Sequence, residues 1–149
     1  MYEELTQKYS ILKSETIAND ILKLYVKPNQ IKSVLSDLKN IAELSFDILI
    51  SLVAADKNSF FELSYILFST TTNNDLIIAT EISKDNPLTD SVCDIYKSAN
   101  WDEREIFDLF GIKFNAHPNL KRILLPKGWI GYPLRKDYVM NDARLNWNK

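Results

Sequence analysis

The sequence predicts an α+β fold, in which helices cover a mostly antiparallel sheet and an extended C-terminal strap follows. Three apolar runs, over 46–55, 59–69 and 75–82, are separated by short polar turns, a spacing typical of antiparallel hairpins. All three glycines, all three tryptophans and three of the five prolines lie from Trp101 onward. Because glycine and proline interrupt regular backbone, this last third is predicted to be turn-rich and extended.

Periodicity of the apolar residues places the other elements. Helices are predicted where apolar residues recur every three or four positions, and strands where they alternate or form dense runs. The predicted elements are, in chain order, a helix over 2–12, a strand over 22–26, a helix over 29–42, the strands over 46–55, 59–69 and 75–82, and a helix over 87–96. In the last helix, Leu88, Val92 and Ile95 are expected to face the core. Residues 1–99 therefore form the predicted α/β scaffold domain, and residues 100–149 form a docking segment of the same structural unit.

A further helix is predicted to open the docking segment. Asn100 and Glu103 have the spacing of a capping box, so this helix is expected to begin at Asn100. Gly111 is placed to end it in the left-handed conformation. Arg104 and Asp108 stand four residues apart, so the two side chains are expected to pair.

Composition is that of an ordinary globular chain. Apolar residues make up 46% of the 149 residues and charged residues 26%. The acidic start is unlike a secretory signal, and no apolar run is long enough to span a bilayer, so membrane contact is expected only through partners. Cys93 is the only cysteine, which excludes an internal disulfide, and it is predicted to be an inert buried thiol.

Charge is divided unevenly along the chain. From His117 onward there are seven basic and two acidic residues, a net of +5, which leaves −7 for residues 1–116 because the whole chain carries −2. The basic end is either a solvated tail or a strap that binds an acidic surface. Nucleic-acid binding is a third interpretation, but the acidic remainder would repel phosphate and no RNP-like motif is present.

A few polar residues could support chemistry instead. A stand-alone acid–base enzyme would use Glu103, Asp108 and His117, and it requires these side chains to converge around a pocket. Capping and pairing already explain the two acids, and no Gly-x-Ser-x-Gly elbow is present. His117 has no cysteine or histidine at ligand spacing, so no metal site is expected, and its imidazole is predicted to be hydrogen-bonded in a turn with Pro118.

Three blocks in the last third carry a family resemblance. Residues 103–112 are EREIFDLFGI, residues 117–124 are HPNLKRIL, and residues 133–137 are PLRKD. In this order and spacing they resemble the smaller hydrophilic subunit of respiratory NADH:quinone oxidoreductase (complex I). It is known as the C subunit in bacteria and as the J subunit in the NAD(P)H-quinone complex of cyanobacteria and plastids. The stretch WIGYP over 129–133 is most similar to the cyanobacterial and plastid branch.

The resemblance implies a non-catalytic, peripheral-arm subunit that binds no cofactor and braces its neighbours. Its partners would be the large quinone-site subunit, which is related to the hydrogenase large chain, and the iron–sulfur subunits. The assembled complex uses NAD(P)H or ferredoxin, iron–sulfur clusters and quinone, and the translocase activity belongs to the complex. The chain would lie at the cytoplasmic or stromal face of the inner, plasma or thylakoid membrane. Equivalent subunits of membrane-bound hydrogenases and of ferredoxin- or F420-dependent quinone reductases are the alternatives.

Partner docking is expected in the same segment. The residues expected to dock are Glu103, Arg104, Asp108, His117, Arg122, Trp129, Tyr132, Pro133, Arg135, Lys136 and Asp137. Trp129 and Arg135 are expected to anchor the strap, because tryptophan and arginine most often dominate protein interfaces.

Overall fold

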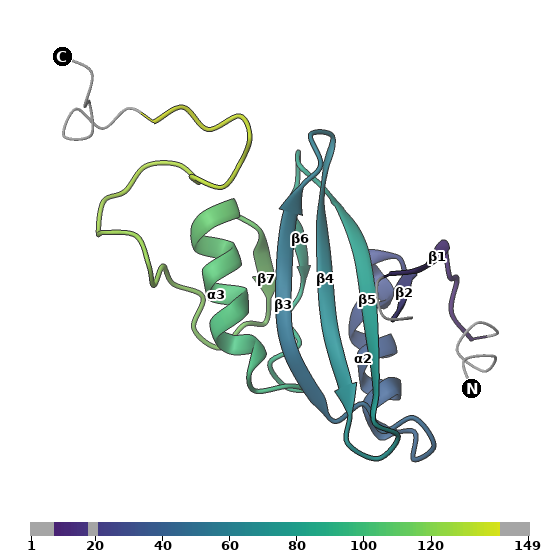
Figure 1. Cartoon of the computed structure of the whole chain (residues 1–149). Helices are drawn as coiled ribbons and strands as arrows, with labels where there is room; N and C mark the ends of the chain where they lie inside the picture. The colour runs from purple at the N-terminus through teal and green to yellow at the C-terminus, as the bar shows by residue number, and fades with distance from the viewer. Residues whose placement is uncertain (1–7, 18–20, 141–149) are drawn as a thin grey trace.

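A five-stranded sheet forms the centre of the computed structural model, which describes residues 8–17 and 21–140 (Figure 1). The strands lie in the order β1-β2-β5-β4-β3. Their bounds are β1 Lys13–Thr16, β2 Leu22–Tyr25, β3 Ile48–Asp56, β4 Phe60–Ser69 and β5 Asn74–Ser83. The predicted α+β class is confirmed. The helix predicted over 2–12 lies mostly outside the described residues.

Pairing within this sheet is mostly antiparallel. β3, β4 and β5 form the antiparallel meander that the three apolar runs predict. β1 is antiparallel to β2, whereas β2 is parallel to β5. The parallel pair arises because the chain leaves β2 through helix α2 (Ile31–Asn40), runs through β3 and β4, and only then adds β5 beside β2.

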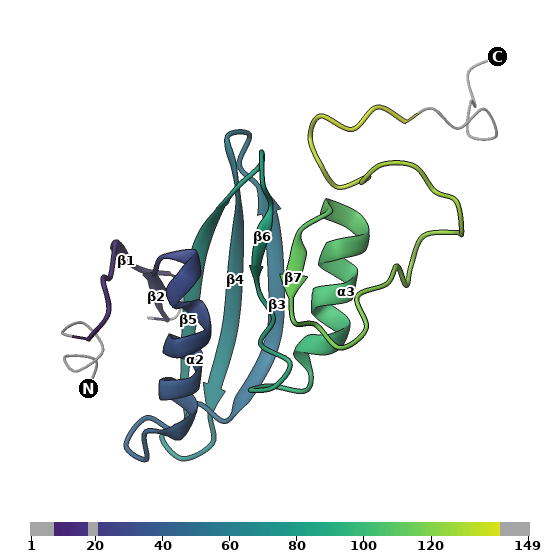
Figure 2. The ribbon, with the colours of Figure 1, turned by 180° about the vertical axis from the view of Figure 1, so that it is seen from behind.

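Helix α2 covers one face of the sheet (Figure 2). It follows a 3-10 turn, η2 (Pro28–Gln30), so the predicted helix over 29–42 is correct to within about one turn. The buried residues of its apolar stripe are Ile31, Val34, Leu35 and Leu38. Alternate residues of β4 join the same core, namely Phe61, Leu63, Tyr65 and Leu67. Each large apolar side chain buried in this way contributes about 1.5–3 kcal/mol to folding.

The second long helix, α3 (Ala99–Phe110), lies along the free edge of β3 (Figure 1). The Asp102 carboxylate Oδ2 accepts the backbone N–H of Leu52 at 2.8 Å, and the Ser98 hydroxyl donates to the carbonyl of Leu49 at 3.3 Å. These contacts satisfy edge groups that would otherwise be open to strand addition. No helix within the described ranges is long and apolar enough to cross a membrane.

The helix predicted over 87–96 is wrong. Its first part is a short strand, β6 (Leu88–Asp90), which pairs in parallel with β7 (Lys113–Asn115) in a second sheet. The rest is a turn, in which the N–H groups of Ile95 and Tyr96 both bond to the carbonyl of Val92. A local apolar spacing of three and four fits a strand plus a turn as well as a helix. The strand partner that decides between them comes much later in the chain.

The start of α3 differs from the prediction, whereas its end is as predicted. The helix begins at Ala99 with Ser98 at the N-cap position and no side-chain cap, so the predicted capping box of Asn100 and Glu103 does not form. Gly111 does end the helix, with φ of +72°. A Cβ at this position would lie 2.5 Å from the ring of Tyr132, so both backbone conformation and space require glycine here.

We predict that Asp102→Ala weakens the sheet edge. The substitution leaves the Leu52 N–H without its acceptor, which costs about 1–3 kcal/mol of unfolding free energy. Chemical denaturation measures the loss, and hydrogen exchange should show faster exchange of the Leu52 amide. Glu105→Ala is the control, because Glu105 is exposed on the same helix and should change stability by less than about 0.5 kcal/mol. Equal effects of the two variants would contradict the role given to Asp102.

Candidate functional site

The described part of the strap, residues 117–140, folds back on α3, and its last part passes over the C-terminal end of the helix (Figure 1). Asp108 is the acceptor that fixes its path. Its Oδ2 accepts the backbone N–H groups of Ile123, Leu124 and Leu125 at 3.0, 2.7 and 3.0 Å. Its Oδ1 accepts Nη1 of Arg122 at 2.9 Å. One buried carboxylate thus binds four successive residues of the strap.

The electrostatics of Asp108 follow from these contacts. Burial alone would raise the pKa of its carboxyl group, but the three backbone N–H groups and the Arg122 guanidinium outweigh burial, so the pKa lies below its usual value. A lowered folded-state pKa means that Asp108 stabilises the fold above its unfolded-state pKa. This stability is lost as the pH falls through the folded-state value.

Two arginines clamp the ring of Tyr132 against the end of α3. The Arg122 guanidinium lies 5.1 Å from the ring centroid, and its Nη2 donates to the carbonyl of Gly131 at 3.1 Å. The Arg135 guanidinium lies 4.8 Å from the same ring, and its Nε donates to the carbonyl of Phe110 at 2.5 Å. Cations are favoured at this end of a helix because its free carbonyls carry partial negative charge.

A second carboxylate, Asp56 at the end of β3, holds the strap further along. Its Oδ2 accepts the backbone N–H of Lys136 at 3.0 Å and the Lys84 ammonium at 2.8 Å. Burial opposes ionisation, but these donors and the N–H of Asn58 lower the pKa of Asp56 to about 2. The strap is therefore tied to the sheet as well as to α3.

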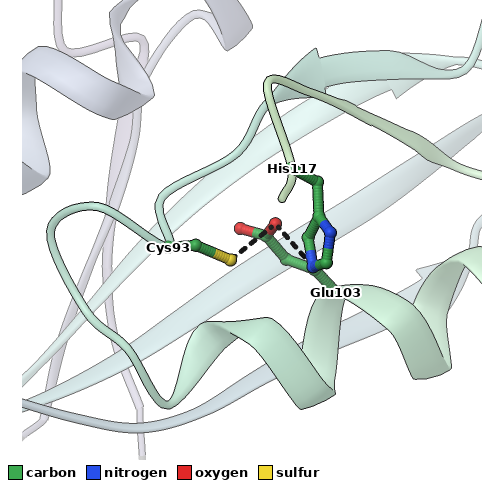
Figure 3. A group of neighbouring side chains, drawn as sticks. All are labelled: Cys93, Glu103 and His117. Atoms are coloured by element: carbon green, nitrogen blue, oxygen red, sulfur yellow. Dashed lines mark hydrogen bonds and ion pairs between the residues drawn. The ribbon is translucent and has the colours of Figure 1, made fainter. Parts of the chain in front are cut away.

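A buried polar cluster lies where the strap begins (Figure 3). Glu103 accepts the backbone N–H of Val92 at 2.8 Å on Oε1 and the Cys93 thiol at 3.4 Å on Oε2. His117 Nε2 lies 3.9 Å from Oε2, and neither the Glu103 nor the His117 side chain is exposed. Burial, the dominant effect, raises the pKa of Glu103. Its ligand atom and those of Cys93 and His117 all lie within 4.8 Å of one another, which invites comparison with a metal site.

The hydrogen bonds of His117 argue against metal binding. The backbone N–H of Asn119 points at Nδ1 from 2.9 Å, so Nδ1 must be the unprotonated, accepting nitrogen. Nε2 then carries the proton and donates to the carbonyl of Asn100 at 3.2 Å, so it has no lone pair for a metal. Burial also raises the pKa of the Cys93 thiol to about 11, so the thiol is protonated and donates to Glu103. We interpret the cluster as a hydrogen-bonded junction between β6, α3 and the strap.

The same geometry does not support the acid–base enzyme. Glu103 and His117 do lie together, but both are closed off from solvent, and Asp108 is bound to the strap elsewhere. These side chains do not converge on a pocket that a substrate could enter.

The remaining residues expected to dock divide between internal and surface positions. Arg104 does not pair with Asp108 as predicted. Its Nε donates to the carbonyl of Lys121 at 3.2 Å, and its guanidinium lies over the exposed ring of Trp101. Three others are half-buried against the domain, namely Trp129, Pro133 and Arg135, and two are exposed, namely Lys136 and Asp137.

The residues expected to dock did not include the aliphatic residues of the strap, which the structure leaves exposed. Those that are more than half exposed are Leu124, Leu134, Met140, Val139 and Ile130, the last at 88%. Their signal in the sequence is weak, since single exposed aliphatic residues are common. Only the folded strap gathers them on one ordered segment.

We predict that Asp108→Asn loosens the strap. Every partner of this carboxylate is a donor, so the amide NH₂ would have to face a donor, and the loss should be about 3 kcal/mol of unfolding free energy. Limited proteolysis should show faster cleavage within residues 117–140. Asp137→Asn, an exposed acid on the same strap, is the control and should change neither measurement. A cleavage pattern unchanged in the Asp108 variant would sink this assignment.

We predict that the Cys93 thiol titrates near pH 11 in the folded chain. Ultraviolet absorbance of the thiolate measures it, and the urea-unfolded chain, as the control, should titrate near the ordinary value of about 8.5. Because folding raises this pKa, the thiol's contribution to stability is complete below the unfolded-state value and is lost as the pH rises towards 11. A folded-state midpoint at the ordinary value would show that the thiol is solvated.

Comparisons with known proteins agree with the three sequence blocks. The family model described as the respiratory-chain NADH dehydrogenase 30 kDa subunit matches residues 24–144. The C/D subunit of NADH-quinone oxidoreductase from Buchnera aphidicola subsp. Cinara cedri is 40% identical over 125 residues, which cover 77% of this chain but only 22% of that protein. The C subunit of the same enzyme from Roseiflexus sp. (strain RS-1) is 39% identical over 131 residues, covering 86% of this chain and 75% of that protein.

A solved structure shares the fold. A chain of the membrane-bound sulfane sulfur reductase, described as an archaeal respiratory membrane complex, matches with a TM-score of 0.71 and 25% identity, covering 93% of this chain and 83% of that one. The family match spans most of the sequence, and the Roseiflexus relative is more than a third identical over most of both chains. This chain belongs to the 30 kDa subunit family of respiratory-chain NADH dehydrogenase.

Proposed function

We propose that this chain is the peripheral, C-type subunit of a membrane-bound NAD(P)H- or ferredoxin:quinone oxidoreductase of the complex I type. Its strap docks on the large quinone-site subunit. The observation that carries the proposal is the contrast within the strap, whose backbone is fixed by buried groups while its aliphatic side chains point outward. Ile130 and Val139 are 88% and 80% exposed. Ordered apolar surface of this kind marks a protein interface.

Charge supports the same surface. Lys121, Lys127 and Lys136 are exposed on the strap, between the aliphatic residues. The partner surface is therefore apolar with an acidic rim. The Buchnera relative bears the double designation C/D as one polypeptide, of which the region similar to this chain is only 22%. A covalent join between C and D parts supports neighbouring positions for the two subunits, and the iron–sulfur subunits make up the rest of the surroundings.

The chain contributes structure to electron transfer rather than a redox centre. One cysteine cannot ligate an iron–sulfur cluster, and the Cys93 thiol is held in its protonated form. NAD(P)H or ferredoxin, the clusters and quinone are handled by the other subunits. The chain lies peripherally, at the cytoplasmic or stromal face of the membrane that holds the complex.

A second candidate is the equivalent subunit of a related respiratory machine, such as a membrane-bound hydrogenase or an F420-dependent quinone reductase. This second candidate is supported by the match to a chain of the sulfane sulfur reductase, because that respiratory complex contains the same fold. Identifying the subunits that co-purify with the native chain separates the two candidates. A flavin- and NAD-binding module among them indicates an NADH-driven complex.

We predict that the double variant Leu124→Asp, Ile130→Asp folds but fails to assemble. Both side chains are exposed, so the thermal midpoint of the isolated chain should stay unchanged, whereas recovery of the variant with the large subunit should fall at least about tenfold. Leu12→Asp is the control, because Leu12 is 58% exposed but lies next to β1, away from the strap. Normal recovery of the double variant would refute strap docking.

This variant is preferable to replacing Trp129 and Arg135. The Arg135 guanidinium is bound to the Phe110 carbonyl and to two aromatic rings of its own chain. Its removal would loosen the strap before any partner is present, so lost assembly would have two explanations.

A further inference from the structure

A slot opens between the edge strand β3 and helix α3, beneath the strap. Its apolar walls include Val53 of β3, Leu109 of α3 and Leu134 of the strap. Two acids, Asp102 and Glu105, line the same slot from the helix. The Leu134 backbone N–H bonds to the carbonyl of Leu109 at 3.1 Å, so the slot is complete only when the strap is in place.

Size and hydrogen bonding exclude two kinds of occupant. The slot measures about 220 Å³, below the roughly 300–1,000 Å³ of sites that hold cofactors or other small molecules. A volume of this order suits one long side chain. Addition of a partner strand to β3 is also blocked, because the outward N–H of Leu52 already donates to the Asp102 carboxylate.

The two acids of the slot differ in availability. Asp102 is committed to the backbone of β3, whereas Glu105 is exposed and forms no ion pair with any residue that the structure describes. An apolar slot with one free carboxylate at its rim fits a side chain that has an aliphatic stem and a cationic head. Lysine and arginine have this build, since their stems lie on apolar surface while their charge remains near water.

We infer that this slot receives a lysine or arginine side chain of the subunit on which the strap docks. The stem lies on Val53, Leu109 and Leu134, and the cationic head pairs with Glu105. The inference rests on the proposed docking function, and the slot is continuous with the docking surface because Leu134 belongs to both. The inference adds an ion pair with Glu105, which lies on α3 and not on the strap.

The test uses the assembled complex. A photo-crosslinking amino acid in place of Val53 should yield a crosslinked partner peptide that contains a lysine or arginine within a few residues of the attachment point. Glu105→Arg should weaken assembly about tenfold, because a desolvated like-charge contact replaces an ion pair. Glu43→Arg is the matched control, since Glu43 is an exposed acid in the turn after α2 and should assemble normally. Changing the mapped basic residue to glutamate should restore assembly of the Glu105→Arg chain.

Several outcomes would overturn the inference. They are a crosslink to a peptide without a basic residue, a crosslink to a second copy of this chain, and equal assembly of the Glu105→Arg and Glu43→Arg chains. The strap variant Leu124→Asp, Ile130→Asp keeps the two proposals apart. If that variant fails to assemble while Glu105→Arg assembles normally, the slot contact is wrong and docking by the strap stands. If both assemble normally, both proposals fail.

Discussion

The buried carboxylate of Asp108 is the contact on which the strap depends. Residues 117–140 form no regular secondary structure, so the N–H groups of Ile123, Leu124 and Leu125 have no ladder acceptor, and the Asp108 carboxylate supplies one for all three. The requirement is mutual, because a buried carboxylate without donors is equally costly. Once this part is fixed, Arg122 reaches the end of α3 and the Tyr132 ring takes the space above the glycine that ends the helix.

Other acids bind the backbone of distant segments in the same way. The buried carboxylates of Asp56 and Glu103 accept an N–H of Lys136 and one of the turn after β6, and the half-buried Asp102 accepts one of β3. These bonds bear on how the uneven charge of the sequence is interpreted. Part of the acidic charge of residues 1–116 holds the chain's own basic strap, rather than facing solvent. Only the remaining basic residues, chiefly the exposed lysines, are free to complement a partner.

The sequence predicted what local patterns encode. The meander came from dense apolar runs, and Gly111 from its place after a helical period. Long-range pairing was not predictable. β6 and β7 have three residues each, and they are strands only because they pair with one another. The i to i+4 spacing favoured an Arg104–Asp108 pair, but Asp108 binds Arg122, because the strap approaches α3 on that side. Glu103 matched a capping pattern, yet the turn before α3 and the histidine after it draw its carboxylate inward.

An internally fixed strap also changes how docking works. A segment that ordered only on binding would lose backbone and side-chain entropy at the interface, which weakens association. Here the guanidinium of Arg135, which the sequence marks as an interface anchor, and the ring of Tyr132, which is among the residues expected to dock, fix the strap to its own domain. In the proposed docking, the aliphatic side chains left outside meet the partner from a preformed backbone. Because Asp102 of α3 bonds to the edge strand β3, a force on the strap is transmitted through α3 to the sheet, as the proposed bracing role requires.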